Sequence, residues 1–385
     1  MRHIFFFVNP SSGGNLASKF LTPGIRRLEM TLSQHEFNLH FFNIKDGDSG
    51  EKPGFQAIGK LIQNLGPNDQ IYSIACGGDG TVMWMVQELW AHGVDDTKRL
   101  VIGVVPFGTG NDFARAMNWQ PFNACNPWSQ DMRVLTELMR EWTRAAQIFH
   151  DVWLVEASVR AGGSFLKVDN DTKKKVDLGI TKKSFLMSNY FSIGIESRIG
   201  VNFDRRRKNN QVRNKFVYFE EGFKKVLFGN NVPIDKTVRR MTDGDSVIFD
   251  NHTSKKLLPS TMSLVGINIP SFGGGMSIWE DAKPKMKAGV IGREPGHLAD
   301  ACQVVGDGCM EWVSFHSAVG LGSEKVVRGR GYRIDQGPGP YELEFYESLS
   351  DKQRIYFEVD GEFFVVTCPH TFRISHHKQV RTLMR

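Results

Sequence analysis

The amino-acid sequence predicts an α/β domain built on a parallel, doubly wound sheet, followed by a mainly antiparallel β-sandwich domain. In the first 150 residues, short apolar runs alternate with segments whose apolar residues recur at helical spacing, as in parallel sheets. From about Phe149, strand-like runs separated by Gly and Pro turns dominate, which is typical of antiparallel β domains. We therefore expect one domain over residues 1–150 and a second over residues 151–385, whose C-terminal segment could return to pack on the first.

The elements expected in the first domain follow from these patterns. Strands are expected over residues 4–8, 38–44, 70–76 and 100–106, and helices over residues 20–33, 57–65, 81–92, 112–117 and 133–145. The glycine-rich turns come after strands and before helices, which is where open α/β sheets bind their ligands.

The second domain is expected to contain short strands and one helical segment. The strands are expected over residues 150–158, 185–195, 261–269, 310–315, 332–335, 341–346, 355–359 and 363–368. The helix is expected over residues 213–227, and two polar inserts cover residues 169–177 and 243–256.

Composition and cysteine usage indicate the class of protein. The chain has 385 residues, 41% of them hydrophobic and 23% charged, which is the range of globular proteins and is long enough for two cores. No window approaches the roughly 18 uninterrupted apolar residues of a membrane span, and the apolar start is too short for a signal peptide. The five scattered cysteines form no C-x-x-C pair, so we expect a soluble protein of a reducing, cytoplasmic compartment.

Positive charge is concentrated in the middle of the chain. The net charge is +6, and residues 152–257 contain 21 Lys and Arg against 12 Asp and Glu. The run Arg205–Lys208, with Arg213 and Lys215, follows an apolar stretch, a combination that suits peripheral docking on an anionic membrane. A solvated basic loop is the alternative. The sequence contains no nucleic-acid-binding motif, and it does not indicate the oligomeric state.

The run Gly77-Gly78-Asp79-Gly80-Thr81 is the clearest chemical feature. It follows an apolar strand and precedes a helix, so its glycines can present backbone N–H groups to a phosphate. Asp79 would repel a phosphate but could bind Mg²⁺ or accept a proton from an attacking hydroxyl, and Thr81 could cap the helix or contact a phosphate. The alternative is an ordinary strand-to-helix turn with a capping residue.

Two further turns are expected at the same edge of the sheet. Gly108, Thr109, Gly110, Asn111 and Asp112 follow the strand expected over residues 100–106, although Asp112 could be merely a helix cap. Asn9 and Ser11 follow the strand expected over residues 4–8 and would line the rim.

These turns resemble the catalytic domain of the diacylglycerol kinase family, and several later motifs resemble its accessory domain. The motifs lie at residues 9–14, 77–81, 105–115, 189–197, 214–219, 268–275, 306–311 and 357–362, so the resemblance spans roughly residues 3 to 368. Glu196 stands where the family usually carries Asp. The resemblance implies that ATP and Mg²⁺ are used to phosphorylate diacylglycerol to phosphatidic acid.

The resemblance also implies roles for individual residues. ATP would be held by Gly77, Gly78, Gly80, Thr81, Gly108, Thr109, Gly110 and Asn111, with Asn9 and Ser11 at the rim. Asp79 would handle magnesium or the proton, and Asp360 and Glu362 are the other candidates for the general base; the alternative for that pair is a hairpin with two exposed carboxylates. Asp307 with Glu311 would form a structural metal site, as in bacterial relatives, or a plain Asp-Gly turn.

Three other functions remain open at this point. The first is a kinase for a different lipid alcohol, such as sphingosine, ceramide or monoacylglycerol. The second is a membrane-binding homologue that has lost catalysis. NAD kinases share the Gly-Gly-Asp-Gly loop, but the motifs of the second half argue against that class.

Overall fold

The computed structural model divides the chain into two compact units. It describes residues 2–32, 35–66, 69–122, 126–129, 131–169, 171–206, 232–257, 259–283, 298–316 and 329–385. Unit 1 comprises Met1–His150, Gly273–Gly275 and Gln379–Arg385, and unit 2 comprises Asp151–Phe272 and Met276–Lys378.

Unit 1 is built on a largely parallel sheet. Its strands are β1 (Arg2–Val8), β2 (Arg27–Leu32), β3 (His35–Asn43), β4 (Gln70–Gly77) and β5 (Leu100–Pro106), in the order β5-β4-β1-β3-β2. β1 is parallel to β3 and β4, and β4 is parallel to β5, whereas β2 is an antiparallel edge strand. At the other edge, Thr382 near the C-terminus pairs in parallel with Ile102 of β5.

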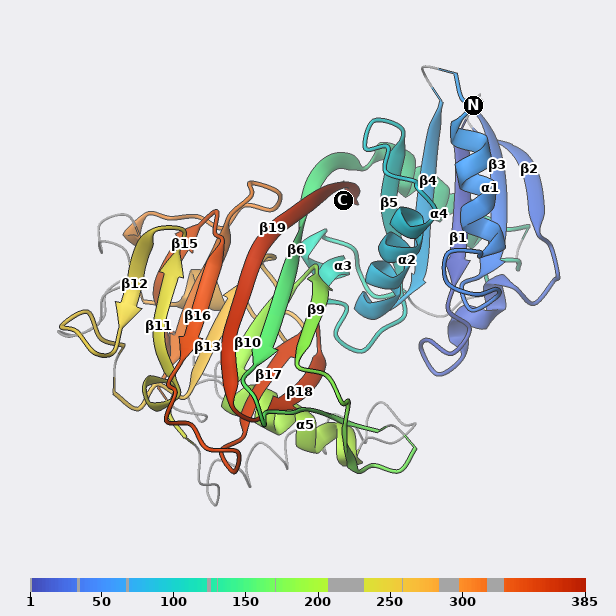
Figure 1. Cartoon of the computed structure of the whole chain (residues 1–385). Coiled ribbons are helices and arrows are strands. Elements are labelled where there is room, and N and C mark those ends of the chain that lie inside the picture. The colour runs from blue at the N-terminus through green and yellow to red at the C-terminus, as the bar shows by residue number, and fades with distance from the viewer. Residues whose placement is uncertain are drawn as a thin grey trace. The chain divides into compact units, whose positions relative to one another are not determined.

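Helices cover both faces of this sheet because neighbouring residues of β1 point to opposite sides. The helices are α1 (Pro53–Ile62), α2 (Asp79–Ala91), α3 (Asp112–Ala116) and α4 (Arg133–Arg144) (Figure 1). Phe7 stacks on Phe55 of α1 with ring centroids 4.0 Å apart, and Phe6 contacts Trp142 of α4 at 5.6 Å. The doubly wound α/β domain predicted from the sequence is therefore confirmed.

The prediction of a helix over residues 20–33 is wrong. The chain forms a short 3-10 helix at Leu16–Phe20, turns at Gly24, where φ is +69°, and continues as β2. The apolar residues that fitted a helical period, Leu28 and Leu32 among them, also alternate along β2 and pair with β3. The turn at Gly24 and the unpaired edge of β3 favour a strand, since a two-residue period satisfies the same apolar positions.

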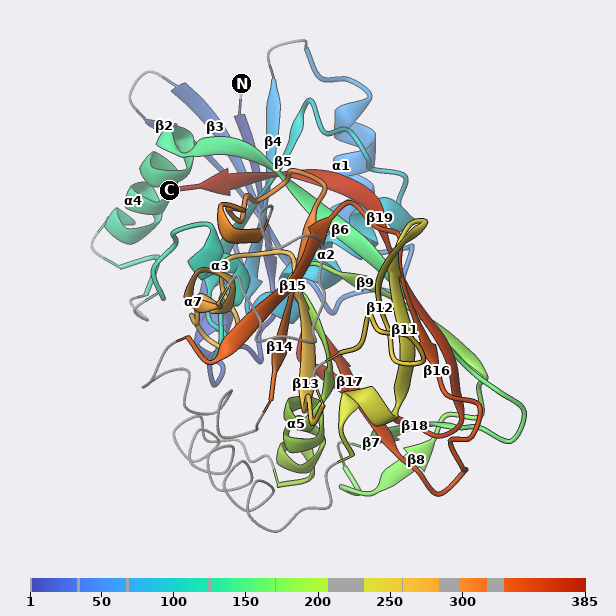
Figure 2. The same ribbon diagram turned by 90° about the vertical axis from the view of Figure 1, so that its left-hand side faces the viewer.

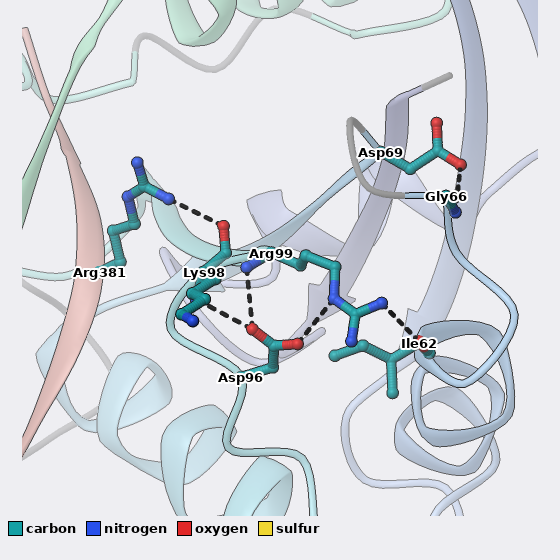
Figure 3. A network of polar contacts seen from close by, with 7 residues as sticks. All are labelled: Ile62, Gly66, Asp69, Asp96, Lys98, Arg99 and Arg381. Atoms are coloured by element: carbon teal, nitrogen blue, oxygen red, sulfur yellow. Dashed lines mark hydrogen bonds and ion pairs between the residues drawn. The ribbon is translucent and has the colours of Figure 1, made fainter.

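A polar network holds the loop that leads into the first residue of β5 (Figure 3). The carboxylate of Asp96 accepts hydrogen bonds from the backbone N–H groups of Lys98 and Arg99 and from Arg99 Nε at 2.7 Å. Burial opposes its ionisation, but the hydrogen bonds from Arg99 and Lys98 hold the pKa of Asp96 below its usual value. Arg99 also donates to the Ile62 carbonyl at the end of α1, and Arg381 donates to the Lys98 carbonyl.

Unit 2 contains two sheets of mainly antiparallel strands. The first contains β6 (Ala146–Val159), β9 (Lys182–Met187), β11 (Val238–Asp243), β12 (Ser246–Asp250), β16 (Tyr341–Phe345) and β19 (Pro369–Met384). The second contains β7 (Phe165–Val168), β8 (Lys175–Asp177), β10 (Tyr190–Gly194), β13 (Ser263–Ile267), β14 (Met310–Phe315), β15 (Gly331–Gly337), β17 (Ile355–Val359) and β18 (Glu362–Val366). β6 and β19 are long strands with residues in both units.

The sheets of unit 2, whose strands are drawn in Figure 2, share one hydrophobic core. Trp153 and Phe372 from the first sheet are buried in one cluster with Phe357 and Trp312 from the second. Phe357 and Phe372 have ring centroids 4.9 Å apart, so side chains of the two sheets touch. This confirms the antiparallel β domain predicted from the sequence.

Several strands of unit 2 were not predicted. The polar inserts contain β8 and β12, which pair in hairpins with β7 and β11, and the C-terminal residues form β19. The helix expected over residues 213–227 lies outside the described residues. A short helix, α5 (Ile195–Arg206), follows β10, and α7 (Ile278–Asp281) follows β13. Within the described part of the chain, no helix combines the length and apolar character needed to cross a membrane.

Candidate functional site

The predicted motifs of unit 1 meet where the parallel strands end. In the sheet register, Val8 of β1 lies beside Asn43 of β3 and Cys76 of β4, and Gly77 lies beside Pro106 of β5. The residues that follow these strands are therefore neighbours at one edge. Asn9 N donates to the Cys76 carbonyl at 3.1 Å and Phe107 N donates to the Gly77 carbonyl at 2.8 Å, which ties the three turns together.

Glycine is required where two of these turns touch. A Cβ on Gly108 would lie 2.7 Å from the Cα of Gly78, and a Cβ on Gly77 would lie 2.2 Å from Thr81 Oγ1. Side chains at these positions would force the turns apart. The glycines thus allow the two loops to pack backbone against backbone, which leaves their N–H groups uncovered by side chains.

The N-terminus of α2 has no capping side chain. Gly78 is the N-cap residue and makes no side-chain hydrogen bond, while Thr81, one turn into the helix, is buried. The first N–H groups of a helix and its dipole attract anions. This helix end, bordered by the Gly108 turn, is suited to binding a phosphate.

A chain of polar side chains joins the first turn to this site. Asn9 Nδ2 donates to Thr81 Oγ1 at 3.2 Å, and Ser11 Oγ donates to Asn9 Oδ1 at 2.9 Å. Lys45 Nζ donates to Ser11 Oγ at 3.0 Å. The sequence analysis did not identify Lys45, although its position just beyond the strand expected over residues 38–44 places a cation at this edge.

The carboxylate of Asp79 is directed at the start of α3. Its Oδ2 accepts the N–H of Asp112 at 3.1 Å and its Oδ1 accepts the N–H of Phe113 at 2.8 Å. Asp79 therefore caps a neighbouring helix rather than the helix in which it lies. Each oxygen retains lone pairs that could face a metal ion.

Asp112 extends this connection to a third segment. Its carboxylate accepts the N–H of Gly274 at 2.9 and 3.0 Å and the N–H of Gly275 at 3.1 Å, and its side chain is buried. Two carboxylates thus join residues 77–81, 108–113 and 273–275. From the sequence we considered Asp112 a possible helix cap and did not place Gly274 and Gly275 in unit 1, because their partner lies more than 160 positions away.

Asn111 has a buried amide oxygen that could accept a ligand's hydrogen bond. The residue adopts a left-handed conformation with φ +52°, and its Nδ2 donates to the Gly108 carbonyl at 2.9 Å. Its Oδ1 has no hydrogen-bond partner among the described residues. A buried acceptor without a partner costs stability, so its presence at this edge favours a ligand-binding role.

In unit 2, Asp360 lies at the turn between β17 and β18. Asp360 has φ +49°, and its carboxylate accepts the backbone N–H groups of Ser188, Asn189 and Tyr190 at 2.7, 2.8 and 3.1 Å. It therefore orders the turn between β9 and β10. Glu362 is exposed and forms an ion pair with Lys167 at 2.7 Å. Asp79 belongs to unit 1, and Asp360 and Glu362 belong to unit 2.

Asp307, in the turn before β14, and Glu311, in β14, are carboxyl groups whose ionisation is disfavoured. Asp307 Oδ1 accepts the N–H of Cys309 at 2.9 Å, as in an Asp-Gly turn, and burial raises the pKa of Asp307. Burial also raises the pKa of Glu311 to about 8, against the hydrogen bonds from Gln336 and Gln303. No three His, Cys, Asp or Glu side chains converge as a metal site within the described ranges.

Glu196 is buried at the start of α5. Ser263 Oγ donates to Glu196 Oε2 at 2.6 Å, and the side chain is in the interior of unit 2. Burial raises the pKa of Glu196 to about 7, because the charged form loses its hydration.

The uncapped start of α2 and the glycines beside it thus lie at the strand ends of an α/β unit. The sequence matches the diacylglycerol kinase catalytic domain over residues 3–149 and the diacylglycerol kinase accessory domain over residues 186–363. The chain belongs to the diacylglycerol kinase family.

Curated relatives cover most of the chain. They include the probable diacylglycerol kinase 3 of Caenorhabditis elegans, 26% identical over 100% of this chain and 44% of the relative. Diacylglycerol kinase theta of Homo sapiens is 28% identical over 95% of this chain and 33% of the relative. The eye-specific diacylglycerol kinase of Drosophila melanogaster is 28% identical over 75% of this chain and 18% of the relative. The chain spans less than half the length of these relatives.

Replacement of Gly108 by Ala should destabilise unit 1, because the new methyl group would meet the backbone of Gly78. We expect the free energy of unfolding to fall by about 1–3 kcal/mol in denaturant titrations. Gly80→Ala is the matched control, since nothing lies within 4 Å of a Cβ there. Equal stability of the two variants would contradict the close approach of the loops.

Replacement of Glu196 by Gln should remove a pH dependence of stability. Between pH 4.5 and about 7, folded Glu196 keeps a proton that the unfolded chain releases, so its contribution makes stability fall as pH rises through this window. Above pH 7, Glu196→Gln should therefore be more stable than the wild type, by on the order of 2–3 kcal/mol. Chemical unfolding at pH 5 and pH 8 measures this difference, and an identical pH dependence in both proteins would refute it.

Proposed function

We propose that the chain is an ATP-dependent lipid kinase that transfers the γ-phosphate of ATP to the hydroxyl of diacylglycerol, forming phosphatidic acid. The observation that carries this proposal is the glycine-lined edge of unit 1, where Asp79 connects the Gly77–Thr81 loop to α3. Membership of the diacylglycerol kinase family and the names of the curated relatives support the choice of lipid.

The phosphates of ATP fit the uncapped start of α2. There the N–H groups of the Gly77–Thr81 loop, together with the Gly108–Asn111 turn, would bind the phosphate oxygens. Lys45, held by Ser11, would add a positive charge at the rim. Asn9 would position Thr81 through their hydrogen bond.

Magnesium fits a site made jointly by protein and nucleotide. Mg²⁺ is usually bound through one or two carboxylates together with substrate phosphates, so a single side chain such as Asp79 is sufficient. When bound, the ion would neutralise charge on the phosphate oxygens. The carboxylate of Asp79 is held in place by the N–H groups of α3, which fixes its orientation toward the loop.

The proton of the lipid hydroxyl needs an acceptor, for which we keep three candidates. Asp79 is the first, and Asp360 and Glu362 are the others. Asp360 already accepts three backbone N–H groups, which favours a positioning role for it, whereas Glu362 is exposed and has one charged partner. We propose Asp79 for magnesium or the proton, with Asp360 supporting the turn after β9.

The membrane is the natural location of this substrate. We propose that the protein is cytoplasmic and associates peripherally with membranes. The basic run at residues 205–208, expected to bind anionic lipid, lies mostly outside the described residues, as do Arg213 and Lys215.

Asp79→Asn should abolish most of the kinase activity. The amide side chain that replaces the carboxylate cannot accept both N–H groups of α3 with charged oxygens, and it cannot offer a carboxylate to magnesium. We therefore expect kcat to fall roughly 10²–10⁴-fold. Asp96→Asn is the matched control, because Asp96 also accepts two backbone N–H groups but lies where β5 begins. The assay uses labelled ATP and diacylglycerol in detergent micelles. Full activity of Asp79→Asn would refute the mechanism.

The same assay with a panel of lipid alcohols tests the substrate. Diacylglycerol should be phosphorylated faster than monoacylglycerol, ceramide or sphingosine. A preference for sphingosine would identify sphingosine, and not diacylglycerol, as the substrate. Nucleotide binding without turnover on any lipid would indicate a membrane-binding homologue that has lost catalysis.

A further inference from the structure

The edge of the second sheet of unit 2 presents apolar and basic side chains on one face. β7 and β8 are its last strands, next to β18 (Figure 2). The pairing register places Val176 of β8, Lys167 of β7 and Phe364 of β18 in one row across the sheet. Residues paired in this way share a face, so the row runs from a buried aromatic ring to the edge of the sheet.

Two large apolar side chains at this edge are solvent-exposed. Val176 is 47% exposed and Leu178, two residues further along the same face, is 36% exposed. Leu178 N donates to the Phe165 carbonyl at 2.8 Å, so the strand direction continues through this residue. Exposed apolar residues on an edge strand invite association, and proteins usually avoid them unless the surface has a partner.

Two lysines lie beside the aromatic end of this row. Lys167 Nζ lies 4.9 Å from the centre of the Phe364 ring, and Lys183 Nζ lies 5.2 Å from the Phe185 ring and 5.9 Å from the Phe364 ring. These cation–π contacts hold the ammonium groups beside the aromatic row. Residues 165–185 contain six lysines and three aspartates, a net charge of +3, which is half the net charge of the whole chain.

Two of the three aspartates of this segment accept hydrogen bonds within the chain, whereas Asp171 is exposed, and Lys167 is paired with Glu362 at 2.7 Å. Asp169 Oδ1 accepts the backbone N–H and the hydroxyl of Thr172 within the turn, both at 2.7 Å. Asp177 neighbours Val176 and so lies on the opposite face of β8, where it accepts the N–H of Gly179 at 2.9 Å. The exposed face therefore combines apolar side chains with positive charge. We call Lys174, Val176, Leu178 and Lys183 the β8 face.

We propose that the β8 face docks on a membrane surface that contains anionic lipid. Val176 and Leu178 would enter the headgroup layer, and Lys174 and Lys183 would face the phosphates. The charge of the face complements an anionic surface, and an apolar edge bordered by lysines matches the polarity of the membrane interface. The inference rests on the proposed function for its biological setting, because a kinase for a membrane lipid must reach that membrane. It does not involve the basic run at residues 205–208.

Vesicle sedimentation of the full chain tests the β8 face. The protein should bind phosphatidylcholine vesicles that contain phosphatidylserine and bind pure phosphatidylcholine weakly. Lys174→Gln with Lys183→Gln should weaken the partition coefficient roughly 10- to 30-fold, because each lysine near the surface contributes about three- to fivefold. Val176→Ser with Leu178→Ser should weaken it several-fold and leave the salt dependence unchanged.

Matched controls remove similar groups elsewhere. Lys60→Gln removes an exposed lysine of α1, and Val304→Ser removes a valine that is 54% exposed. Both should bind vesicles like the wild type. Thermal unfolding of every variant checks that the fold is retained. If loss of the Lys183 cation–π contacts unfolds the Lys174→Gln/Lys183→Gln variant, the Val176→Ser/Leu178→Ser variant still tests the proposal.

Absence of wild-type binding to anionic vesicles, or unchanged binding by both β8-face variants, would overturn the proposal. A change in the oligomeric state of the variants without vesicles would also overturn it, in favour of strand pairing with a second copy. Activity on a short-chain diacylglycerol in solution separates this test from the proposed function. That activity should persist in the variants; if the chain phosphorylates no lipid while the variants still lose vesicle binding, the proposed function fails and the docking face stands.

Discussion

The geometry of the candidate site depends on the carboxylate of Asp79, which accepts the N–H groups of Asp112 and Phe113. Asp112 in turn accepts the N–H groups of Gly274 and Gly275, so two side chains hold three segments distant in sequence. Hydrogen bonds to a charged group contribute roughly 1.5–3 kcal/mol each, and they are directional. They act together with the backbone hydrogen bonds of Asn9 and Phe107 to fix the glycine turns, since glycine has no side chain to pack.

The same arrangement explains why a binding loop can contain an aspartate. A negative charge inside an anion site would be unfavourable unless it were directed away from the anion or neutralised by a cation. The negative charge of Asp79 is partly neutralised by the dipole of α3, because the Asp79 carboxylate lies at the start of that helix. The start of α2 therefore remains available for a phosphate, and in the proposed function Asp79 would be the residue that holds the metal ion.

The sequence was sufficient to predict the edge of the sheet but not the connections made across it. Strands over residues 70–76 and 100–106 were predicted because apolar runs ended in glycine turns, and parallel strands must end at a common edge. The target of the Asp79 carboxylate could not be predicted, because it depends on how close the start of α3 lies to the start of α2 in the folded chain. The contact of Asp112 with Gly274 and the hydrogen bond of Lys45 to Ser11 depend on long-range packing, which no local pattern encodes.

Errors in the secondary-structure prediction have a similar cause. Residues 27–32 fitted a helical period but form β2 because β3 offers an unpaired edge. β8 and β12 lie within the inserts expected over residues 169–177 and 243–256, and both are partly exposed, so composition alone did not indicate strands. In unit 2, Asp360 shows that an acidic residue in a family motif can be engaged with the backbone, a role that sequence cannot distinguish from catalysis.

Amide hydrogen exchange in the wild type and in Asp79→Ala tests the central claim most directly. Peptides covering Asp112–Phe113 and Gly274–Gly275 should both exchange faster in the variant, because loss of Asp79 frees α3 and thereby loosens Asp112. Peptides around Asp96, where β5 begins, should be unchanged. Unaltered exchange at both Phe113 and Gly274 would contradict the account, because it would mean that Asp79 does not hold these segments together.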